Sequence, residues 1–383
     1  MAGCNKSDLI TGGDETGAEI GNHYIHFDTG ITTRASLYEH DDNILEADFY
    51  VLGYQYKGTW GANKVMAEPN VFYSNADNSQ LQIPLYVDYE EGIYSYSNPQ
   101  KWTGNTYSFF GYYPTNNTNI TLFERDNKGG IISKEGEPYI IYDLSGNNNT
   151  VNPDKMVDVM TATSIDKTLL GAIQSDGVVM NFKHRLSAIE VCARNYYEGF
   201  DHDNDGDAEG STPRKPVYVE ITDLGIELSN ISYTSAYIYL DHTRSPLTTD
   251  KKATPVAGGA KLTYQYVNST NPVEIEPNTG LQYVSNDDNI MLLIPQSDYL
   301  NCKLTSLKYK TKYQNDNGNW ITLSTVDYLQ LDPAPVSEFK FTKELLESHR
   351  YYIDLTFTSD AVSVNISAAE EWDRKDDIEH TFE

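Results

Sequence analysis

The chain has 383 residues, of which 39% are apolar and 12% aromatic, and its formal net charge is −28. A surface this acidic repels phosphate backbones, so the composition excludes nucleic acid as the expected partner. The length predicts two domains, and the 30 Tyr favour strands over helices. No apolar run approaches the ~20 residues of a membrane-spanning helix.

The first residues look like the end of a trimmed export signal. Ala2 and Gly3 precede Cys4, as small residues precede the lipidated cysteine of a bacterial lipobox. The stretch that follows is rich in Gly, Asp and Ser, a composition typical of a flexible tether. We therefore expect lipidation at Cys4 and a lipoprotein tether over residues 1–22.

The next part of the chain reads as strand after strand. Tyr24–Thr33 alternates, with Ile25, Phe27 and Ile31 on one face. Clusters of Pro, Gly, Asn and Asp separate further strand-like runs, as turns do. These runs lie at residues 47–56, 81–87 and 107–113. We predict a first domain over residues 23–176.

The second domain is predicted over residues 177–383. It opens with one long strand, Val178–Cys192, whose phase shifts near Ile189 and indicates a bulge. One short helix is expected at Thr342–Ser348, with Thr342 as its N-cap. Further strands are expected near residues 216–229, 233–240, 262–267, 289–295, 303–313, 319–329, 350–358 and 361–367. Many short strands at this spacing predict sandwiches or barrels.

One acidic run resembles the start of a calcium-binding loop. Asp201, Asp203, Asp205 and Asp207 alternate around a Gly, and carboxylate oxygens are the ligands that Ca²⁺ prefers. The twelfth position of an EF-hand loop requires Glu, and here it is Thr212, so an EF-hand is rejected. A looser calcium-binding loop and a solvated acidic loop both stay open.

Other chemistry-bearing residues give weak signals. His184 lies on the apolar phase of its strand without metal-ligand neighbours, which favours a buried structural histidine. Cys192 and Cys302 are either a disulfide of an exported protein or two buried thiols. The chain carries no HExxH, GxSxG or phosphate-binding glycine motif, so we expect no enzyme and no cofactor.

Arg34 closes the first alternating strand and opens a polar stretch. An Arg in an exposed connection is a target for a trypsin-like protease, and the bond at stake is Arg34–Ala35. The alternative is an ordinary surface arginine, and the chemistry of this segment alone favours that alternative.

Taken together, these pieces resemble the fimbrillin family, the FimA/Mfa-like pilins of Bacteroides-type bacteria. The resemblance is spread over most of the chain and rests on the order and spacing of motifs that are individually weak. They are Ala2-Gly3-Cys4, Thr33-Arg34-Ala35, Phe109-Phe110-Gly111-Tyr112-Tyr113-Pro114, Asp158-Val159-Met160-Thr161-Ala162, Phe182-Lys183-His184-Arg185-Leu186-Ser187, Leu293-Ile294-Pro295-Gln296, Tyr351–Phe357, and Trp372 after Val364-Asn365-Ile366.

The resemblance implies an all-β fold of two transthyretin-like β-sandwich domains in tandem. It also implies export as an outer-membrane lipoprotein, cleavage after Arg34 by an Arg-specific protease, and release of the strand Tyr24–Thr33. A strand from another pilin subunit would then fill the vacated groove, giving a head-to-tail polymer at the cell surface. The candidate donor strand carries Val362, Val364 and Ile366.

One feature departs from the pattern of a stalk pilin and bears on where this subunit would lie in the fimbria. Residues 370–379 are heavily charged, an awkward composition for a buried donor strand, which favours a tip or anchor subunit over a stalk pilin. The receptor implied is a glycan or protein of a host or bacterial surface.

Two other functions are weighed. A surface-anchored glycan-binding lipoprotein could stack sugars on Trp60, Trp102, Trp320 and many of the Tyr, although most such aromatic residues belong to cores or strand surfaces. A β-sandwich hydrolase would need two carboxyl groups brought together by the fold, and no motif points to such a pair.

Overall fold

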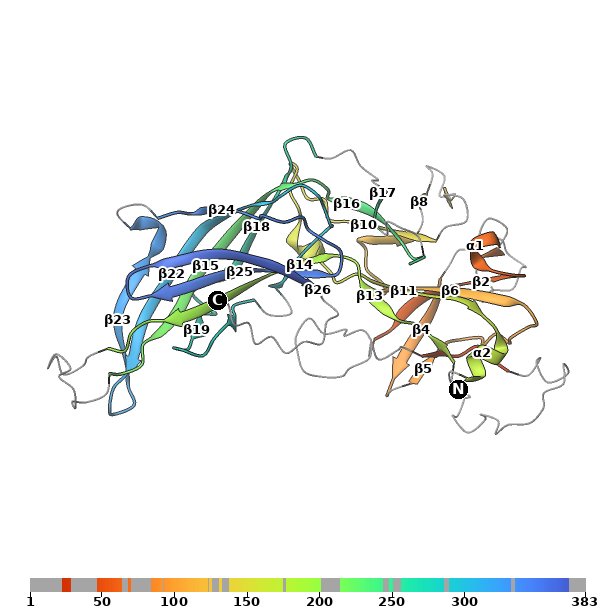
Figure 1. Ribbon diagram of the computed structural model, residues 1–383, viewed down its shortest axis with the longest axis horizontal. Coiled ribbons are helices and arrows are strands. Elements are labelled where there is room, and N and C mark those ends of the chain that lie inside the picture. The colour runs from red at the N-terminus through yellow and green to blue at the C-terminus, as the bar shows by residue number, and fades with distance from the viewer. Residues whose placement is uncertain are drawn as a thin grey trace.

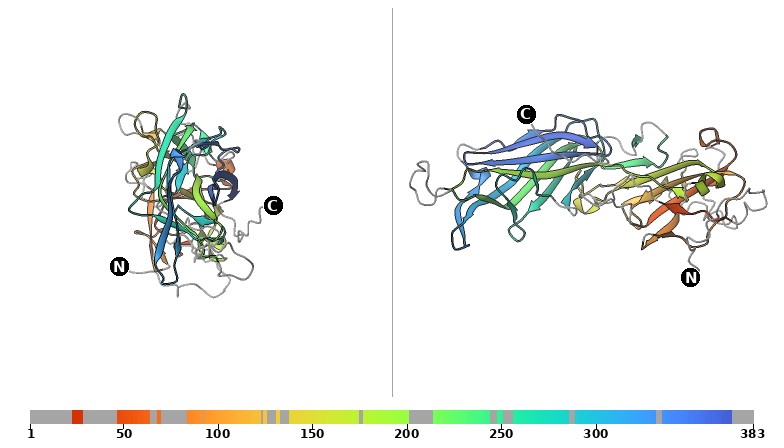
Figure 2. Two further views of the ribbon diagram at one scale, coloured as in Figure 1. Left: turned by 90° about the vertical axis from the view of Figure 1, so that its left-hand side faces the viewer. Right: turned by 60° about the horizontal axis from the view of Figure 1, so that its bottom comes forward.

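The computed structural model describes the chain in segments. These are residues 23–28, 47–63, 68–69, 84–91, 93–122, 124–125, 131–132, 138–174, 177–200, 214–243, 248–250, 256–285, 289–331 and 335–371. In these segments the protein is all-β, which confirms the predicted fold class, and the molecule is elongated with two lobes along its long axis (Figures 1 and 2). The transthyretin-like topology of the two lobes stays a prediction.

The N-terminal lobe is built on a seven-stranded sheet. Its strands in spatial order are β13 (Phe182–His184), β11 (Met160–Lys167), β6 (Thr106–Tyr113), β2 (Phe49–Tyr56), β4 (Leu85–Glu90) and β5 (Ile93–Ser95), with β3 (Glu68–Pro69) beside β2. Two short helices, α1 (Trp60–Asn63) and α2 (Leu169–Gln174), belong to the same lobe (Figure 1).

Both faces of this sheet are covered. A four-stranded sheet packs toward one face, in the order β17 (Thr248–Asp250), β16 (Ser235–Tyr239), β10 (Tyr139–Asp143) and β7 (Ile120–Leu122). On the other face lie β1 (Phe27–Asp28) and β12 (Val178–Val179), which pair in parallel. A separate hairpin joins β8 (Glu124–Arg125) to β9 (Ile131–Ile132).

Burial on both faces explains the composition of the central strands. In β6, Tyr107 and Phe109 pack into one core, while Phe110 and Tyr112 pack into the other. A strand that is covered on both sides reads as a continuous apolar run instead of an alternating one. The predicted strands at residues 47–56 and 107–113 are therefore confirmed as β2 and β6.

The C-terminal lobe packs two sheets against each other around the larger core. The first has the order β20 (Gln282–Tyr283), β14 (Ser187–Tyr196), β25 (His349–Thr358) and β26 (Val362–Glu371), with β21 (Met291–Leu293) beside β14. The second has the order β18 (Ala260–Val267), β15 (Tyr218–Ile231), β22 (Asn301–Gln314) and β23 (Trp320–Asp327), with β19 (Val273–Ile275) and β24 (Glu338–Lys340) alongside.

The predicted single strand at 178–192 is wrong. The chain forms three strands there, β12, β13 and β14, because it leaves the sheet of the N-terminal lobe after His184 and enters the C-terminal lobe at Ser187. Consequently β12 and β13 pair with strands that precede residue 176. The domain boundary at that residue stays a prediction.

The predicted helix at Thr342–Ser348 is also wrong. Leu345 lies in an isolated bridge with Gln296, and each residue donates its main-chain N–H to the other's carbonyl at 2.9 and 3.0 Å. The Leu345 side chain is buried in the core. These tertiary bonds override the local helix propensity of the sequence.

The junction between the lobes is held by charged and polar groups. Arg185 is fully buried and forms an ion pair with Glu347. Its main-chain N–H donates to the carbonyl of Val159 at 2.8 Å, and the N–H of Ser348 donates to Leu186 at 3.1 Å. The segment that crosses between the lobes is therefore fixed from both sides.

His242 lies near this junction and supplies a pH dependence. Its Nε2 shares a hydrogen bond of 2.7 Å with Thr161, while burial and the positive charges of Arg185 and Lys183 lower its pKa from 6.5 to about 3. Because the unfolded chain binds a proton more readily, stability falls as the pH drops below about 6.5.

We expect urea unfolding to show a loss of about 2 kcal/mol from this group between pH 6.5 and 5, at 1.36 kcal/mol per pKa unit. The variant His242→Gln keeps a hydrogen-bonding side chain without the titration, so it should lose about 2 kcal/mol less over the same interval. Equal pH slopes for the two proteins would contradict this assignment.

Candidate functional site: docking of the N-terminal segment

Residues 23–28, the N-terminal segment, are held by main-chain hydrogen bonds on two sides. On one side they pair with residues 100–102, and on the other with residues 177–180. The four bonds run from Ile25 N to Gln100 O (2.8 Å), Trp102 N to His23 O (2.9 Å), Val178 N to His26 O (2.8 Å) and Met180 N to Asp28 O (2.7 Å). The segment is thus an inserted strand and not a surface tail.

The side chains of the segment alternate cleanly. Ile25 and Phe27 are buried at 1% and 6% exposure, whereas Tyr24, His26 and Asp28 are exposed. The Phe27 ring meets three aromatic rings with centroid separations of 5.4–6.1 Å, those of Phe49, Tyr96 and Phe109. Edge-to-face and tilted contacts of this kind stabilise beyond the area that they bury.

The docking site under the segment is an aromatic face of the seven-stranded sheet. Phe49, Phe109 and Phe182 lie in the same core cluster as Ile25 and Phe27. Burying two such side chains stabilises by about 1.5–3 kcal/mol each. Withdrawal of the segment would expose this aromatic face together with the main-chain groups of residues 100–102 and 177–180.

Gly177 permits the close approach of the segment. It has φ +136°, in the region that favours glycine, and a Cβ there would lie 3.2 Å from the carbonyl oxygen of His26. That same carbonyl accepts the hydrogen bond from Val178. A side chain at residue 177 would therefore strain the backbone and crowd the docked segment.

Sequence reasoning found only half of this site. It singled out Ile25 and Phe27, but it missed the partners that hold them, namely Tyr96, Trp102, Gly177, Val178 and Met180. The available signal was the apolar pair Val178 and Met180 directly after a glycine. Ile31, Arg34 and Ala35 lie outside the described residues, as do Cys4 and Asp201, Asp203, Asp205 and Asp207.

The candidate donor residues lie in β26, at the edge of their own sheet. Val362 is buried, and Val364 and Ile366 pack against the core, while the strand pairs antiparallel with β25. Donation of these residues would require β26 to leave β25 and uncover part of the core. Their donor role stays a prediction.

The remaining sequence-predicted residues have structural environments. Cys192 and Cys302 are both buried free thiols on β14 and β22, in different sheets, so the disulfide alternative is wrong. Burial raises the pKa of the Cys302 thiol to about 12. His184 is fully buried and its Nδ1 lies 2.9 Å from an Asp158 carboxylate oxygen, as a structural histidine should.

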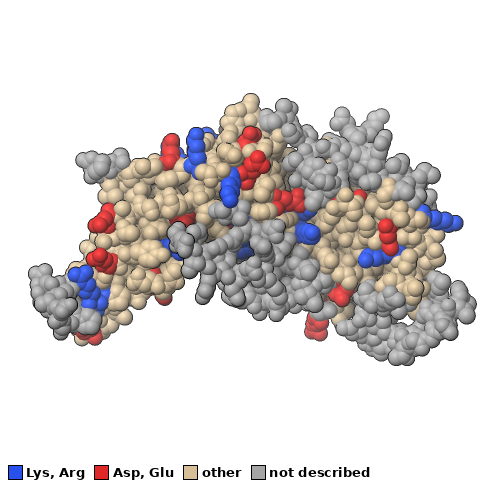
Figure 3. Space-filling view, viewed as in Figure 1, with Lys and Arg blue, Asp and Glu red and all other residues tan. Residues whose placement is uncertain are grey.

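Within the described segments, no group of three His, Cys, Asp or Glu side chains is arranged to hold a metal ion. No helix of the described part is long and apolar enough to span a membrane. On the face shown in Figure 3, Lys and Arg lie scattered among Asp, Glu and neutral residues, without one extended basic surface.

Two of the three tryptophans weighed for sugar stacking are unavailable. Trp60 and Trp102 are 1% and 2% exposed and belong to the two cores. Trp320 is 45% exposed on β23, where Lys312 lies over its ring at 4.7 Å and Tyr218 meets its edge at 4.9 Å. Of these three tryptophans, only Trp320 is exposed enough to stack on a sugar.

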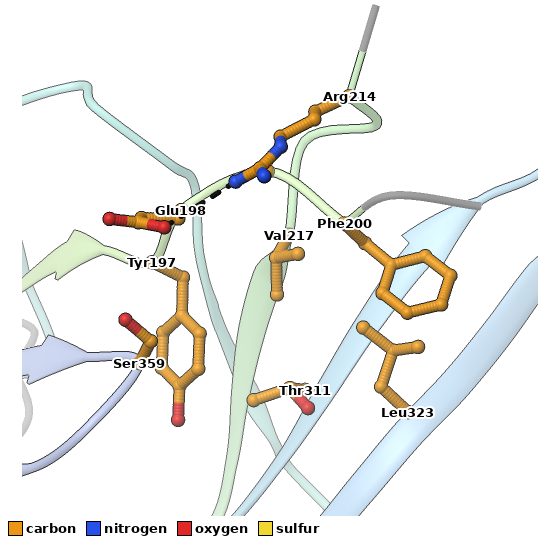
Figure 4. A pocket seen from close by; sticks show the side chains of 9 residues that line it. Tyr197, Glu198, Phe200, Arg214, Val217, Thr311, Leu323 and Ser359 are labelled. Atoms are coloured by element: carbon orange, nitrogen blue, oxygen red, sulfur yellow. Dashed lines mark hydrogen bonds and ion pairs between the residues drawn. The ribbon is translucent and has the colours of Figure 1, made fainter. Parts of the chain in front are cut away.

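A shallow cleft of about 310 Å³ opens at the far end of the C-terminal lobe. Figure 4 shows apolar side chains from Val217, Phe200 and Leu323 lining it, with Arg214 and Glu198 above them at 3.4 Å from each other.

The sheets and the inserted N-terminal segment define an all-β protein. Among solved structures, the chain resembles a fimbrial protein from Bacteroides vulgatus, with a TM-score of 0.51 and 16% identity over 92% of this chain and 100% of that one. The fimbrial anchor protein Mfa2 from Porphyromonas gingivalis matches at a TM-score of 0.29 and 12% identity over 91% of this chain and 96% of that one. No curated protein matches.

The model of the fimbrillin-like family matches residues 33–372. The chain therefore belongs to the fimbrillin-like family, which is a fimbrial family and not an enzyme family. The match confirms the resemblance inferred from the scattered motifs.

Docking of the N-terminal segment can be tested with Phe27→Ala. Removing this side chain leaves a cavity among aromatic rings, so we expect about 3–5 kcal/mol of destabilisation. Hydrogen exchange is the sharper measurement, because the amides of Val178 and Met180 donate to the segment and should exchange much faster.

The matched control is Asp28→Ala, which changes an exposed side chain and keeps the main-chain acceptor. It should leave the exchange rates of both amides nearly unchanged. Docking through the buried side chains would be refuted by equal protection of these amides in wild type and Phe27→Ala.

Proposed function

We propose that this protein is a subunit of a fimbria that assembles by strand exchange at the docking site of the N-terminal segment. An Arg-specific protease cuts between Arg34 and Ala35, and the strand Tyr24–Thr33 then leaves. A strand of a neighbouring subunit takes its place. The observation that carries the proposal is the insertion of residues 23–28 into an apolar site between two main-chain partners.

The energetics favour replacement over an empty site. Loss of the segment leaves the N–H groups of Trp102, Val178 and Met180 without their acceptors and exposes aromatic rings of Phe49 and Phe109. An incoming extended strand with apolar side chains two residues apart restores both kinds of contact. The empty site would therefore be reactive toward a donor.

The geometry of such an exchange produces a polymer. The acceptor site lies in the N-terminal lobe, and the candidate donor residues Val362, Val364 and Ile366 lie in the other lobe of the elongated molecule. A contact between two different surfaces that does not close on itself repeats without end. The partners are then other fimbrial subunits, joined head to tail.

Export and anchoring complete the proposal. Lipidation at Cys4 would hold the precursor at the outer membrane until cleavage after Arg34 separates the lipidated end from the rest of the chain. The order of events couples release from the membrane to opening of the docking site. The assembled protein would then belong to the cell surface, where adhesion takes place.

The test is an Arg-specific protease applied to the full chain and to Arg34→Ala, with N-terminal sequencing and electron microscopy as readouts. We expect wild type to be cut once after Arg34 and to form filaments, and Arg34→Ala to stay uncut and monomeric. The matched control is Arg214→Ala, an arginine whose side chain is 47% exposed, and it should behave as wild type.

Hydrogen exchange adds a structural readout. Amides of Trp102, Val178 and Met180 should lose protection after the cut and regain it in filaments. Filaments from uncut Arg34→Ala, or filaments in which these amides stay unprotected, would sink the proposal.

A further inference from the structure

The strand β23 is an exposed edge at the far end of the C-terminal lobe (Figure 1). It pairs with β22 on one side, and it is the last strand in the order of its sheet. Its first six residues are all exposed, including Trp320 at 45%, Ile321 at 39% and Leu323 at 36%. An edge of this kind presents a row of main-chain N–H and C=O groups to solvent.

The composition of β23 lacks the usual protection of an edge. The strand reads Trp-Ile-Thr-Leu-Ser-Thr-Val-Asp, with no Pro, no Lys and one charge at its last position. Native proteins blunt exposed edges with Pro, charged residues, short strands or bulges. Of these devices, β23 has one bulge, at Leu323, and one charge, at Asp327.

The other edges in the described sheets are short or blunted. The edge strands β5, β7, β13 and β17 have three residues each. The edge of β18 is met by main-chain hydrogen bonds between Lys261 and residues 149–151. β26 is longer, at ten residues, and carries two charges at its end. Among the long edge strands described, β23 alone exposes large apolar side chains, those of Trp320, Ile321 and Leu323.

We propose that β23 is a homotypic docking surface, which pairs antiparallel with β23 of a second copy of this chain. The proposal does not rest on strand exchange at the N-terminal segment. It adds a second, two-fold contact that would link separate subunits through the ends of their C-terminal lobes. The partner strand supplies the missing main-chain hydrogen bonds of the edge.

Charge selects a second copy at this surface. Two chains of net charge −28 repel each other, so contact is favoured where the local charge is balanced. On β22, beside β23, three lysines lie within 4 Å of four carboxylates. The lysines are Lys308, Lys310 and Lys312, and the carboxylates are those of Glu220, Asp223, Glu274 and Asp327. The edge is therefore nearly neutral in an otherwise acidic molecule.

The side chains are also compatible with self-pairing. An antiparallel pair centred on Leu323 sets Trp320 opposite Val326 and Ile321 opposite Thr325. Pairs of an aromatic and a β-branched residue, such as Trp320 with Val326, stabilise neighbouring strands, and so do pairs such as Ile321 with Thr325. No two like charges lie opposite each other in this arrangement. Asp327 then lies opposite Asn319, a neutral residue, on the partner.

A contact through one strand is small, so its affinity is modest. Interfaces well below 1,200 Å² are typical of weak association, and we expect a dissociation constant of roughly 10⁻⁵ to 10⁻³ M. Within a polymer, many such contacts would form at once. The high effective concentration of the linked subunits would then make the overall binding much tighter than one contact alone.

The experiment uses the full chain carrying Arg34→Ala and no protease, so that strand exchange at the N-terminal segment is absent. Sedimentation velocity from about 10 µM to 1 mM should show reversible dimerisation. Hydrogen exchange over the same range should show protection of the β23 amides that increases with concentration. This second readout needs no change in β23.

A double variant Ile321→Lys and Thr325→Lys places two charges on the exposed edge and should weaken dimerisation at least tenfold. The matched control is Ile93→Lys, which adds a charge at a 61% exposed residue of the edge strand β5 and should leave it unchanged. A monomer throughout the range, or a dimer lost with Ile93→Lys but kept in the double variant, would overturn the proposal.

Discussion

The seven-stranded sheet of the N-terminal lobe must be covered on both faces, and much of the structure depends on that constraint. Its central strands point large aromatic side chains alternately to its two faces, so both faces are apolar and must be buried. The four-stranded sheet around β10 and β16 covers one face. The other face is completed by a six-residue segment from the beginning of the described chain. The docked segment therefore stabilises the lobe, and its removal would both destabilise the lobe and open the docking site.

Strands with strong side-chain signals were predictable from the sequence. The runs near residues 216–229, 303–313 and 350–358 correspond to β15, β22 and β25 within a few residues, because each combines β-branched and aromatic residues between turns. The failures lie where tertiary contacts decide. The break at Arg185 arises from passage between two lobes, and Leu345 is extended because it pairs with Gln296. Neither partner is visible in a local window of sequence.

The same limit applies to the candidate site. The alternation of Ile25 and Phe27 was readable, but the residues that receive them come from distant parts of the chain, at 96–102 and 177–180. Single-sequence periodicity assigns a face to a strand and cannot assign the surface that it meets. Likewise, the sequence left open whether Trp60 and Trp102 stack on sugars or belong to a core, and the fold places both in the cores.

The two neighbours of the N-terminal segment are not equivalent, and this sets a direction. The segment runs antiparallel to residues 100–102 and parallel to residues 177–180. Antiparallel and parallel ladders differ in the spacing and slant of their hydrogen bonds, so a strand inserted in reverse would not reproduce the bonds seen on either side. A strand that reproduces these bonds has the same polarity as the original. A chain of such subunits would have two chemically different ends, and it would grow in a defined orientation.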